Sequence, residues 1–139
     1  MNRRTSLALS ALALMLMAPI VSMAQSAAPS PVGMPWWFSE TVPDKAQAGF
    51  WEAYQGILGP NTAIPPKYQA LMSLAVASQI PCEYCVYGHT KAAENLGATK
   101  EEIRQAVAIG AMIRFNSTII QGNQVDFAKF KAALDAPAK

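Results

Sequence analysis

The sequence predicts an all-α protein, folded as a bundle of about five helices. Three observations support this class. Apolar residues recur at the three- and four-residue spacing that places them on one face of a helix. Proline and glycine fall where these patterns begin and end. No segment has the sustained apolar–polar alternation that is typical of a half-buried strand.

Residues 1–24 have the composition of a secretory signal peptide. Basic Arg3 and Arg4 come first, an apolar run follows from Leu7 to Val21, and a small-x-small cleavage site ends at Ala24. The alternative is a membrane anchor, but the apolar run is short for a membrane span. We therefore expect cleavage after Ala24 and a periplasmic or secreted protein.

Removal of this segment leaves a formally neutral chain, because Lys+Arg falls to 11 − 2 = 9 against 9 Asp+Glu. A neutral chain gives no electrostatic support for a nucleic-acid partner. No later segment is long and apolar enough for a bilayer, so no membrane partner is expected after signal removal. An exported protein meets an oxidising compartment, where its two cysteines can rest as a disulfide.

Residues 25–42 are rich in Ala, Ser and Pro and are expected to form a flexible arm. The aromatic segment Trp36-Trp37-Phe38 interrupts this arm. We expect it to pack onto the helical domain or onto a neighbouring subunit, while a substrate-binding role has no support in the sequence.

A helical domain is expected over residues 43–135, followed by a frayed tail at 136–139. The first helix runs from Pro43 to about Leu58, where Gly59-Pro60 ends it. The second runs from Pro65-Pro66 to Ile80. It is apolar most of the way round, so we expect it to be central. The apolar residues of these two helices are Phe50, Tyr54, Ile57, Leu58, Leu71, Met72, Leu74, Ala75, Val76 and Ile80.

Three more helices are expected after the second one. One starts at Pro81 and stops at Gly97. The next opens with a capping box at Thr99 and runs to about Arg114, with packing residues Ile103, Val107, Gly110 and Met112. The last is capped by Asn116 or Ser117 and carries an apolar stripe formed by Phe127, Phe130 and Leu134.

The segment 81–89 holds both cysteines and the only histidine of the chain. Cys82 and Cys85 are three residues apart, and Cys85 and His89 are four apart, so all three should share one helical stripe. Cys82 is expected in the first turn, where unpaired N–H groups favour a thiolate. A nearby imidazole can accept a thiol proton. The pattern is typical of a reactive dithiol.

The cysteine pair has three other interpretations. A zinc site would be one ligand short, because no second histidine or third cysteine exists. Covalent haem attachment needs a histidine directly after Cys85, where Val86 stands. A purely structural disulfide would contribute about 2 kcal/mol across so short a loop. A redox pair is therefore favoured, and no metal or organic cofactor is expected.

Three stretches of sequence resemble the alkylhydroperoxidase AhpD-like branch of the carboxymuconolactone decarboxylase family. They are Leu71–Ala77, Cys82–Thr90 and Leu96–Ile103, and the resemblance extends over residues 50–134. It implies an all-helical fold assembled as a homo-trimer or homo-hexamer. It also implies an antioxidant activity in which hydroperoxides are reduced and a dithiol partner restores the enzyme.

The resemblance also implies roles for three residues: Cys85 as the peroxidatic thiol, Cys82 as the resolving thiol and His89 as part of a proton relay. The helix start favours Cys82 as the thiolate, whereas the position of His89 one turn after Cys85 favours Cys85. On the resemblance, Cys85 is expected to be the peroxidatic thiol. Decarboxylase members generally lack the cysteine pair, so lactone decarboxylation is not expected.

The sequence departs from the family pattern at one position. Members with full peroxidase activity resemble each other in a glutamate twelve residues before the first cysteine, where this chain has Ala70, and the nearest upstream carboxylate is Glu52. Losing such a base removes a contribution of about 10²–10⁴ in rate. Two alternatives therefore stand beside the peroxidase: a thiol–disulfide exchange protein with weak peroxidase activity, and a non-catalytic helical oligomer with an inert disulfide.

Overall fold

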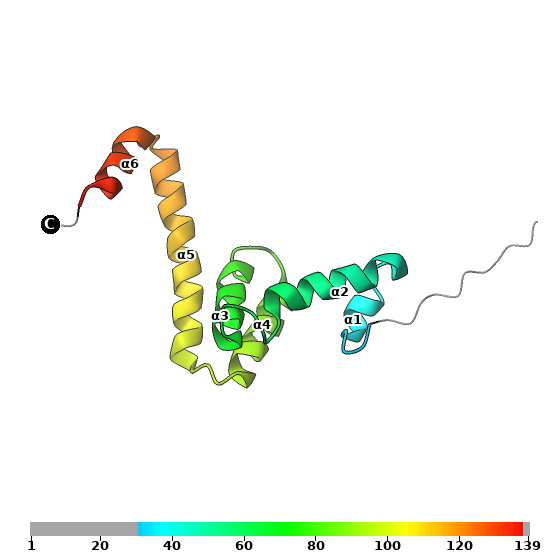
Figure 1. Ribbon diagram of the computed structural model, residues 1–139. Coiled ribbons are helices and arrows are strands. Elements are labelled where there is room, and N and C mark those ends of the chain that lie inside the picture. The colour runs from blue at the N-terminus through cyan, green and yellow to red at the C-terminus, as the bar shows by residue number, and fades with distance from the viewer. Residues whose placement is uncertain (1–30, 138–139) are drawn as a thin grey trace, which may run out of the picture.

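The computed structural model describes residues 31–137, and in this part of the chain helices are joined by turns and loops, with no strand (Figure 1). The predicted all-α class is confirmed. The helices are α1 (Trp36–Ser39), α2 (Asp44–Leu58), α3 (Pro66–Ala77), α4 (Glu83–Asn95), α5 (Lys100–Gly122) and α6 (Phe127–Asp135). The short helix α1 was not among those expected from the sequence.

Helix α3 is the centre of the fold, as its apolar sequence predicted. It packs against both α4 and α5, and Figure 1 shows these three helices side by side. Its buried residues Ala70, Leu74 and Ala77 follow the helical repeat, and the Leu74 side chain is only 1% exposed. The facing buried residues are also small, Ala93 on α4 and Ala106 on α5. Small side chains let the helices approach closely around this narrow core.

The aromatic segment folds as α1 and packs onto α2 through Phe38. The Phe38 ring centroid lies 4.9 Å from that of Phe50 and 5.5 Å from that of Tyr54. Trp36 and Trp37 instead remain exposed. The expected packing onto the helical domain therefore holds for one of the three aromatic residues.

The predicted capping box is present at the start of α5. The backbone N–H of Glu102 donates to Thr99 Oγ1 at 3.1 Å, and the backbone N–H of Thr99 donates to Glu102 Oε2 at 2.7 Å. Just before it, Gly97 adopts a φ of 80°, the left-handed conformation that commonly ends a helix. Glu102 also forms an ion pair with Lys67, whose Nζ lies 2.7 Å from Glu102 Oε1. This ion pair links α3 to α5.

The predicted end of this helix at Arg114 is wrong. Helix α5 continues to Gly122, and neither Asn116 nor Ser117 caps a new helix. No glycine or proline occurs between Gly110 and Gly122 to interrupt it, and polar residues alone weaken a helix too little to end it. The cap of α6 is Asp126, whose Oδ1 accepts the backbone N–H of Lys129 at 2.7 Å.

The end of α3 also differs from the prediction. The helix ends at Ala77 and not at Ile80, and Ser78 forms its C-cap. Residues 78–81 form a turn that leads into α4. A residue directly before proline is disfavoured in the helical conformation, so Pro81 is a reason for the early stop.

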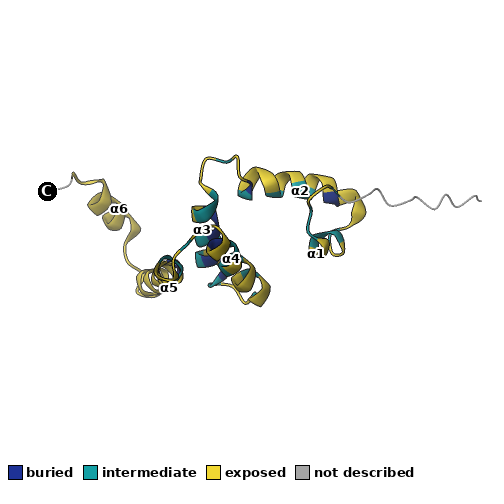
Figure 2. Ribbon diagram, turned by 90° about the horizontal axis from the view of Figure 1, so that it is seen from below, coloured by how far each residue is buried: buried dark blue, intermediate teal, exposed yellow. Residues whose placement is uncertain are grey.

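The second half of α5 and all of α6 bury nothing in the protomer. In Figure 2 helix α6 is coloured as exposed, and Figure 1 shows it at the far end of α5. The exposed large apolar residues here are Met112, Ile113, Phe115, Ile119, Ile120, Val125, Phe127, Phe130 and Leu134. The apolar stripe predicted for α6 therefore exists without a partner: Phe127 is 75% exposed. Within the described residues, no helix has the length and apolar character needed to cross a membrane.

Candidate functional site

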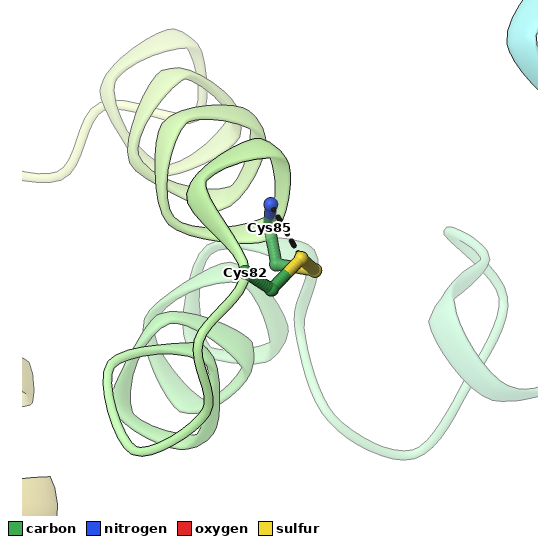
Figure 3. Close-up of a disulfide and its surroundings, with 2 residues drawn as sticks. All are labelled: Cys82 and Cys85. Carbon is green, nitrogen blue, oxygen red and sulfur yellow. Dashed lines mark hydrogen bonds between the residues drawn. A yellow bond between two sulfur atoms is a disulfide. The ribbon is translucent and has the colours of Figure 1, made fainter.

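The two cysteines form a disulfide at the start of α4 (Figure 3). Cys82 is the N-cap residue with extended backbone at φ −132°, and Cys85 lies in the first turn. Their Cα atoms are 5.3 Å apart, within the usual range for a disulfide. The sequence placed Cys82 inside the first turn of a helix that starts at Pro81, whereas the helix starts at Glu83 and Cys82 is its N-cap. The reason is that Pro81 belongs to the preceding turn and does not begin the helix.

The Cys82 sulfur caps the helix. The backbone N–H of Cys85 donates to Cys82 Sγ at 3.2 Å, as the dashed line in Figure 3 marks. This contact satisfies one of the N–H groups that a helix start leaves unpaired. After reduction, the same N–H and the positive end of the helix dipole favour Cys82 as a thiolate.

An open recess of about 570 Å³ lies over this end of α4. The residues that line it are Pro81, Cys82, Glu83, Tyr84 and Val86. Cys82 contributes to the wall of the recess and Cys85 does not, although both cysteines are half-buried. The Tyr84 side chain on this wall is 82% exposed. The disulfide is therefore open to solvent on the Cys82 side.

His89 lies on α4 one turn after Cys85 and is half-buried. Burial lowers the pKa of its imidazole below the ordinary value, so His89 is neutral at pH 7. Among residues 31–137, no side chain forms a hydrogen bond with this imidazole. The structure thus brings the two sulfurs into contact and leaves His89 as an unpaired base on the same helix.

Ala70 occupies the position where a relay glutamate was expected from the resemblance. It is 6% exposed, on the buried side of α3. Its methyl group packs in the core and supplies no base. Within residues 31–137, no three His, Cys, Asp or Glu side chains are grouped so that they could hold a metal ion.

A second recess, of about 550 Å³, lies between α3 and α5 and was not foreseen from the sequence. Its walls are mainly apolar, from Leu71, Met72 and Ile109, and Glu101 and Glu102 line it as well. Neither cysteine nor His89 lines it. Because neither sulfur reaches this recess, the dithiol at the start of α4 remains the candidate site for redox chemistry.

Comparison with known proteins agrees with this picture. A family model described as "Carboxymuconolactone decarboxylase family" matches residues 44–125, which is more than half of the chain. A protein of Paracoccus denitrificans named "Uncharacterized protein 4 in cox locus" is 32% identical over 72 residues. That alignment covers 52% of this chain and 65% of the relative, less than two thirds of the relative's length. No solved structure matches the chain.

Proposed function

The chain belongs to the carboxymuconolactone decarboxylase family, and from this we propose that it is a thiol-dependent peroxidase. The family includes decarboxylases and AhpD-like peroxidases. The feature that favours the second activity is the Cys82–Cys85 disulfide, which joins two sulfurs at a helix start with an open recess beside one of them. A dithiol in this setting can be reduced and oxidised again without rearranging the fold.

The first step of the proposed reaction is attack by the Cys85 thiolate on the terminal oxygen of a hydroperoxide. The O–O bond breaks, Cys85 becomes a sulfenic acid, and the other oxygen leaves as an alcohol after gaining one proton. His89 is proposed as the proton carrier, taking a proton from the Cys85 thiol and returning it to the leaving oxygen. Its lowered pKa keeps the imidazole neutral and able to accept that proton at pH 7.

The second step is condensation. The Cys82 thiol attacks the Cys85 sulfenic sulfur, water leaves, and the disulfide seen in the structure is formed. The peroxide has then accepted two electrons from the two thiols. A dithiol reductant restores the pair by two exchange reactions and becomes a disulfide itself.

The test is consumption of an alkyl hydroperoxide with dithiothreitol as the reductant. We expect wild-type protein to accelerate consumption and Cys85→Ser to lose the acceleration. Ser73→Ala, a change on the neighbouring helix α3, is the matched control and should retain it. Equal rates for wild type and Cys85→Ser would refute the peroxidase.

A second candidate is a thiol–disulfide exchange protein with weak peroxidase activity. The buried methyl group of Ala70 favours it, because no carboxylate on α3 assists proton removal from Cys85. Exchange depends on thiolate character and access, and both are provided at Cys82 without that carboxylate. Rapid reduction of insulin disulfides with slow peroxide turnover would select this function. A non-catalytic oligomer with an inert disulfide predicts neither activity.

Two further properties belong to the proposal. Residues 1–24, which lie outside the described part of the chain, are proposed as a signal peptide that delivers the protein to the periplasm or the medium. The uncovered apolar residues of α5 and α6 support assembly with further copies of the chain. Export fits the disulfide, since oxidising compartments allow one to persist.

A further inference from the structure

We propose that the dithiol partner which re-reduces the pair attacks Cys82, so that the transient mixed disulfide forms on Cys82 and not on Cys85. This inference rests on the proposed function, since it takes the cysteine pair to be a working redox couple. It goes further by assigning the two sulfurs to different reactants. Cys82 exchanges with the partner, and Cys85 meets the peroxide.

The first argument is access. An attacking thiolate approaches a disulfide in line with the S–S bond, from the far side of the sulfur that it attacks. The open recess at the start of α4 includes Cys82 in its wall and excludes Cys85. A thiol carried by a protein needs room for its own backbone, and a recess of about 570 Å³ provides it at Cys82.

The second argument comes from the reverse reaction. When the reduced protein meets a disulfide, the cysteine with more thiolate character and better access attacks first. Cys82 is the N-cap residue, and its sulfur already accepts the N–H of Cys85 at 3.2 Å. By microscopic reversibility, the protein sulfur that attacks a partner disulfide in one direction is the sulfur that the partner thiolate attacks in the other direction. Both directions therefore pass through a mixed disulfide on Cys82.

The exchange balances in two steps. The partner thiolate bonds to Cys82 Sγ, the Cys82–Cys85 bond breaks, and Cys85 leaves as a thiolate that takes up a proton. The second thiolate of the partner then attacks the partner sulfur of the mixed disulfide, and Cys82 leaves as a thiolate that takes up the second proton. The partner is oxidised by two electrons to a disulfide, and its two thiol protons end on Cys85 and Cys82.

The recess also indicates how a partner would be held. Tyr84 and Val86 present apolar surface beside the attacked sulfur, and Tyr84 is among the most exposed aromatic residues of the described chain. A tyrosine ring offers a large contact area at low conformational cost. Glu83 is the one charged residue of the recess wall.

The experiment traps the mixed disulfide on the full chain. The probe is thioredoxin with its resolving cysteine changed to serine, so that the reaction stops after the first step. Oxidised protein is mixed with this probe, quenched with acid, and alkylated with iodoacetamide. Digestion with chymotrypsin cuts after Tyr84 and places Cys82 and Cys85 on separate peptides. Mass spectrometry then reports which peptide carries the probe and which carries the alkyl group.

We expect at least about tenfold more probe on the Cys82 peptide, with the alkyl group on the Cys85 peptide. Probe on Cys85, an even division between the two, or no mixed disulfide at all would overturn the assignment. The readout is independent of peroxide. Absence of peroxidase activity with the probe on Cys82 would therefore refute the peroxidase and leave this inference standing. Peroxidase activity with the probe on Cys85 would support the peroxidase and refute this inference.

A second measurement does not depend on trapping. The single-cysteine variants Cys85→Ser and Cys82→Ser each react with a pyridyl disulfide at a series of pH values. The thiol of Cys82, in the first variant, should react at least about threefold faster at pH 6 and show the lower pKa. A faster reaction of Cys85 would contradict the second argument.

Discussion

Gly110 of α5 lies so close to Ala75 of α3 that a Cβ atom at Gly110 would come within 2.5 Å of the Ala75 carbonyl oxygen. That atom belongs to the backbone and cannot swing aside. We expect Gly110→Ala to lower the free energy of unfolding by about 1–2 kcal/mol, because overpacking outweighs the better helix propensity of alanine. Urea unfolding followed by circular dichroism measures the change. Gly49→Ala on α2 is the control, since its Cβ would meet nothing within 4 Å. It should raise stability by about 0.5–1 kcal/mol.

The capping box at Thr99 gives a second prediction. Thr99→Ala removes the oxygen that accepts the N–H of Glu102, and we expect a loss of about 1 kcal/mol. Thr118→Ala is the matched control, because Thr118 lies on the exposed part of α5 and its hydroxyl only donates to the Arg114 carbonyl within the helix. An equal effect of the two substitutions in thermal unfolding would show that the cap contributes nothing.

His89 predicts how stability depends on pH. Burial lowers its pKa in the folded protein, while the unfolded chain keeps the ordinary value of about 6.5. Between these two pKa values the unfolded state binds more protons than the folded state. The contribution of His89 to stability is therefore present above about pH 6.5 and is lost as the pH falls through the folded pKa. We expect the free energy of unfolding to drop as the pH falls below about 6.5. His89→Gln should flatten that part of the curve, and an unchanged slope would contradict the burial effect.

Ala70 predicts a gain of function. Ala70→Glu supplies a carboxylate where the resemblance places a relay base, and we expect peroxide turnover to rise by about 10²-fold with exchange activity unchanged. Ala70→Gln has nearly the same shape without a base, so it controls for packing at this buried position. Stopped-flow peroxide assays compare the three proteins. If Gln raises turnover as much as Glu, the effect comes from packing and the relay interpretation fails.

The exposed apolar stripe of α6, formed by Phe127, Phe130 and Leu134, predicts that copies of the chain associate. We expect sedimentation velocity to report a species heavier than one protomer, and Phe127→Glu with Phe130→Glu to reduce its mass. Both side chains are exposed in the protomer, so the substitutions leave the packing of α3, α4 and α5 intact. Lys129→Glu changes charge on the same helix without touching the stripe and should leave the mass unchanged. A monomeric wild type would remove this proposal.

The strongest local signals in the sequence located most of the fold. Thr99 with Glu102 marked the start of α5, Gly97 marked the end of α4, and the dense apolar pattern around Leu74 identified the central helix. The end of α5 was misplaced because Asn116 and Ser117 have cap-forming side chains, and only the neighbouring residues decide whether a helix stops there.

The site was foreseen in its residues and less well in its geometry. The three- and four-residue spacing predicted one helical stripe for Cys82, Cys85 and His89, whereas the structure has Cys85 and His89 on α4 and Cys82 as the extended residue that caps it. It did not reveal that Cys82 is the cap, because spacing does not resolve a shift of two residues, from Pro81 to Glu83, at the helix start. The recess was also hidden, since a concave surface depends on how the turn at Pro81 meets α4.

Helix α6 has nine residues and none of them is buried, which makes it too short to persist in water by its own hydrogen bonds. If further copies of the chain cover α6 as proposed, the stability of this helix depends on the protein concentration. In amide hydrogen exchange, we expect α6 to gain protection as the protein is concentrated, while the amides around Leu74 exchange at one rate throughout. The order of α6 would thus change with the concentration of the protein itself.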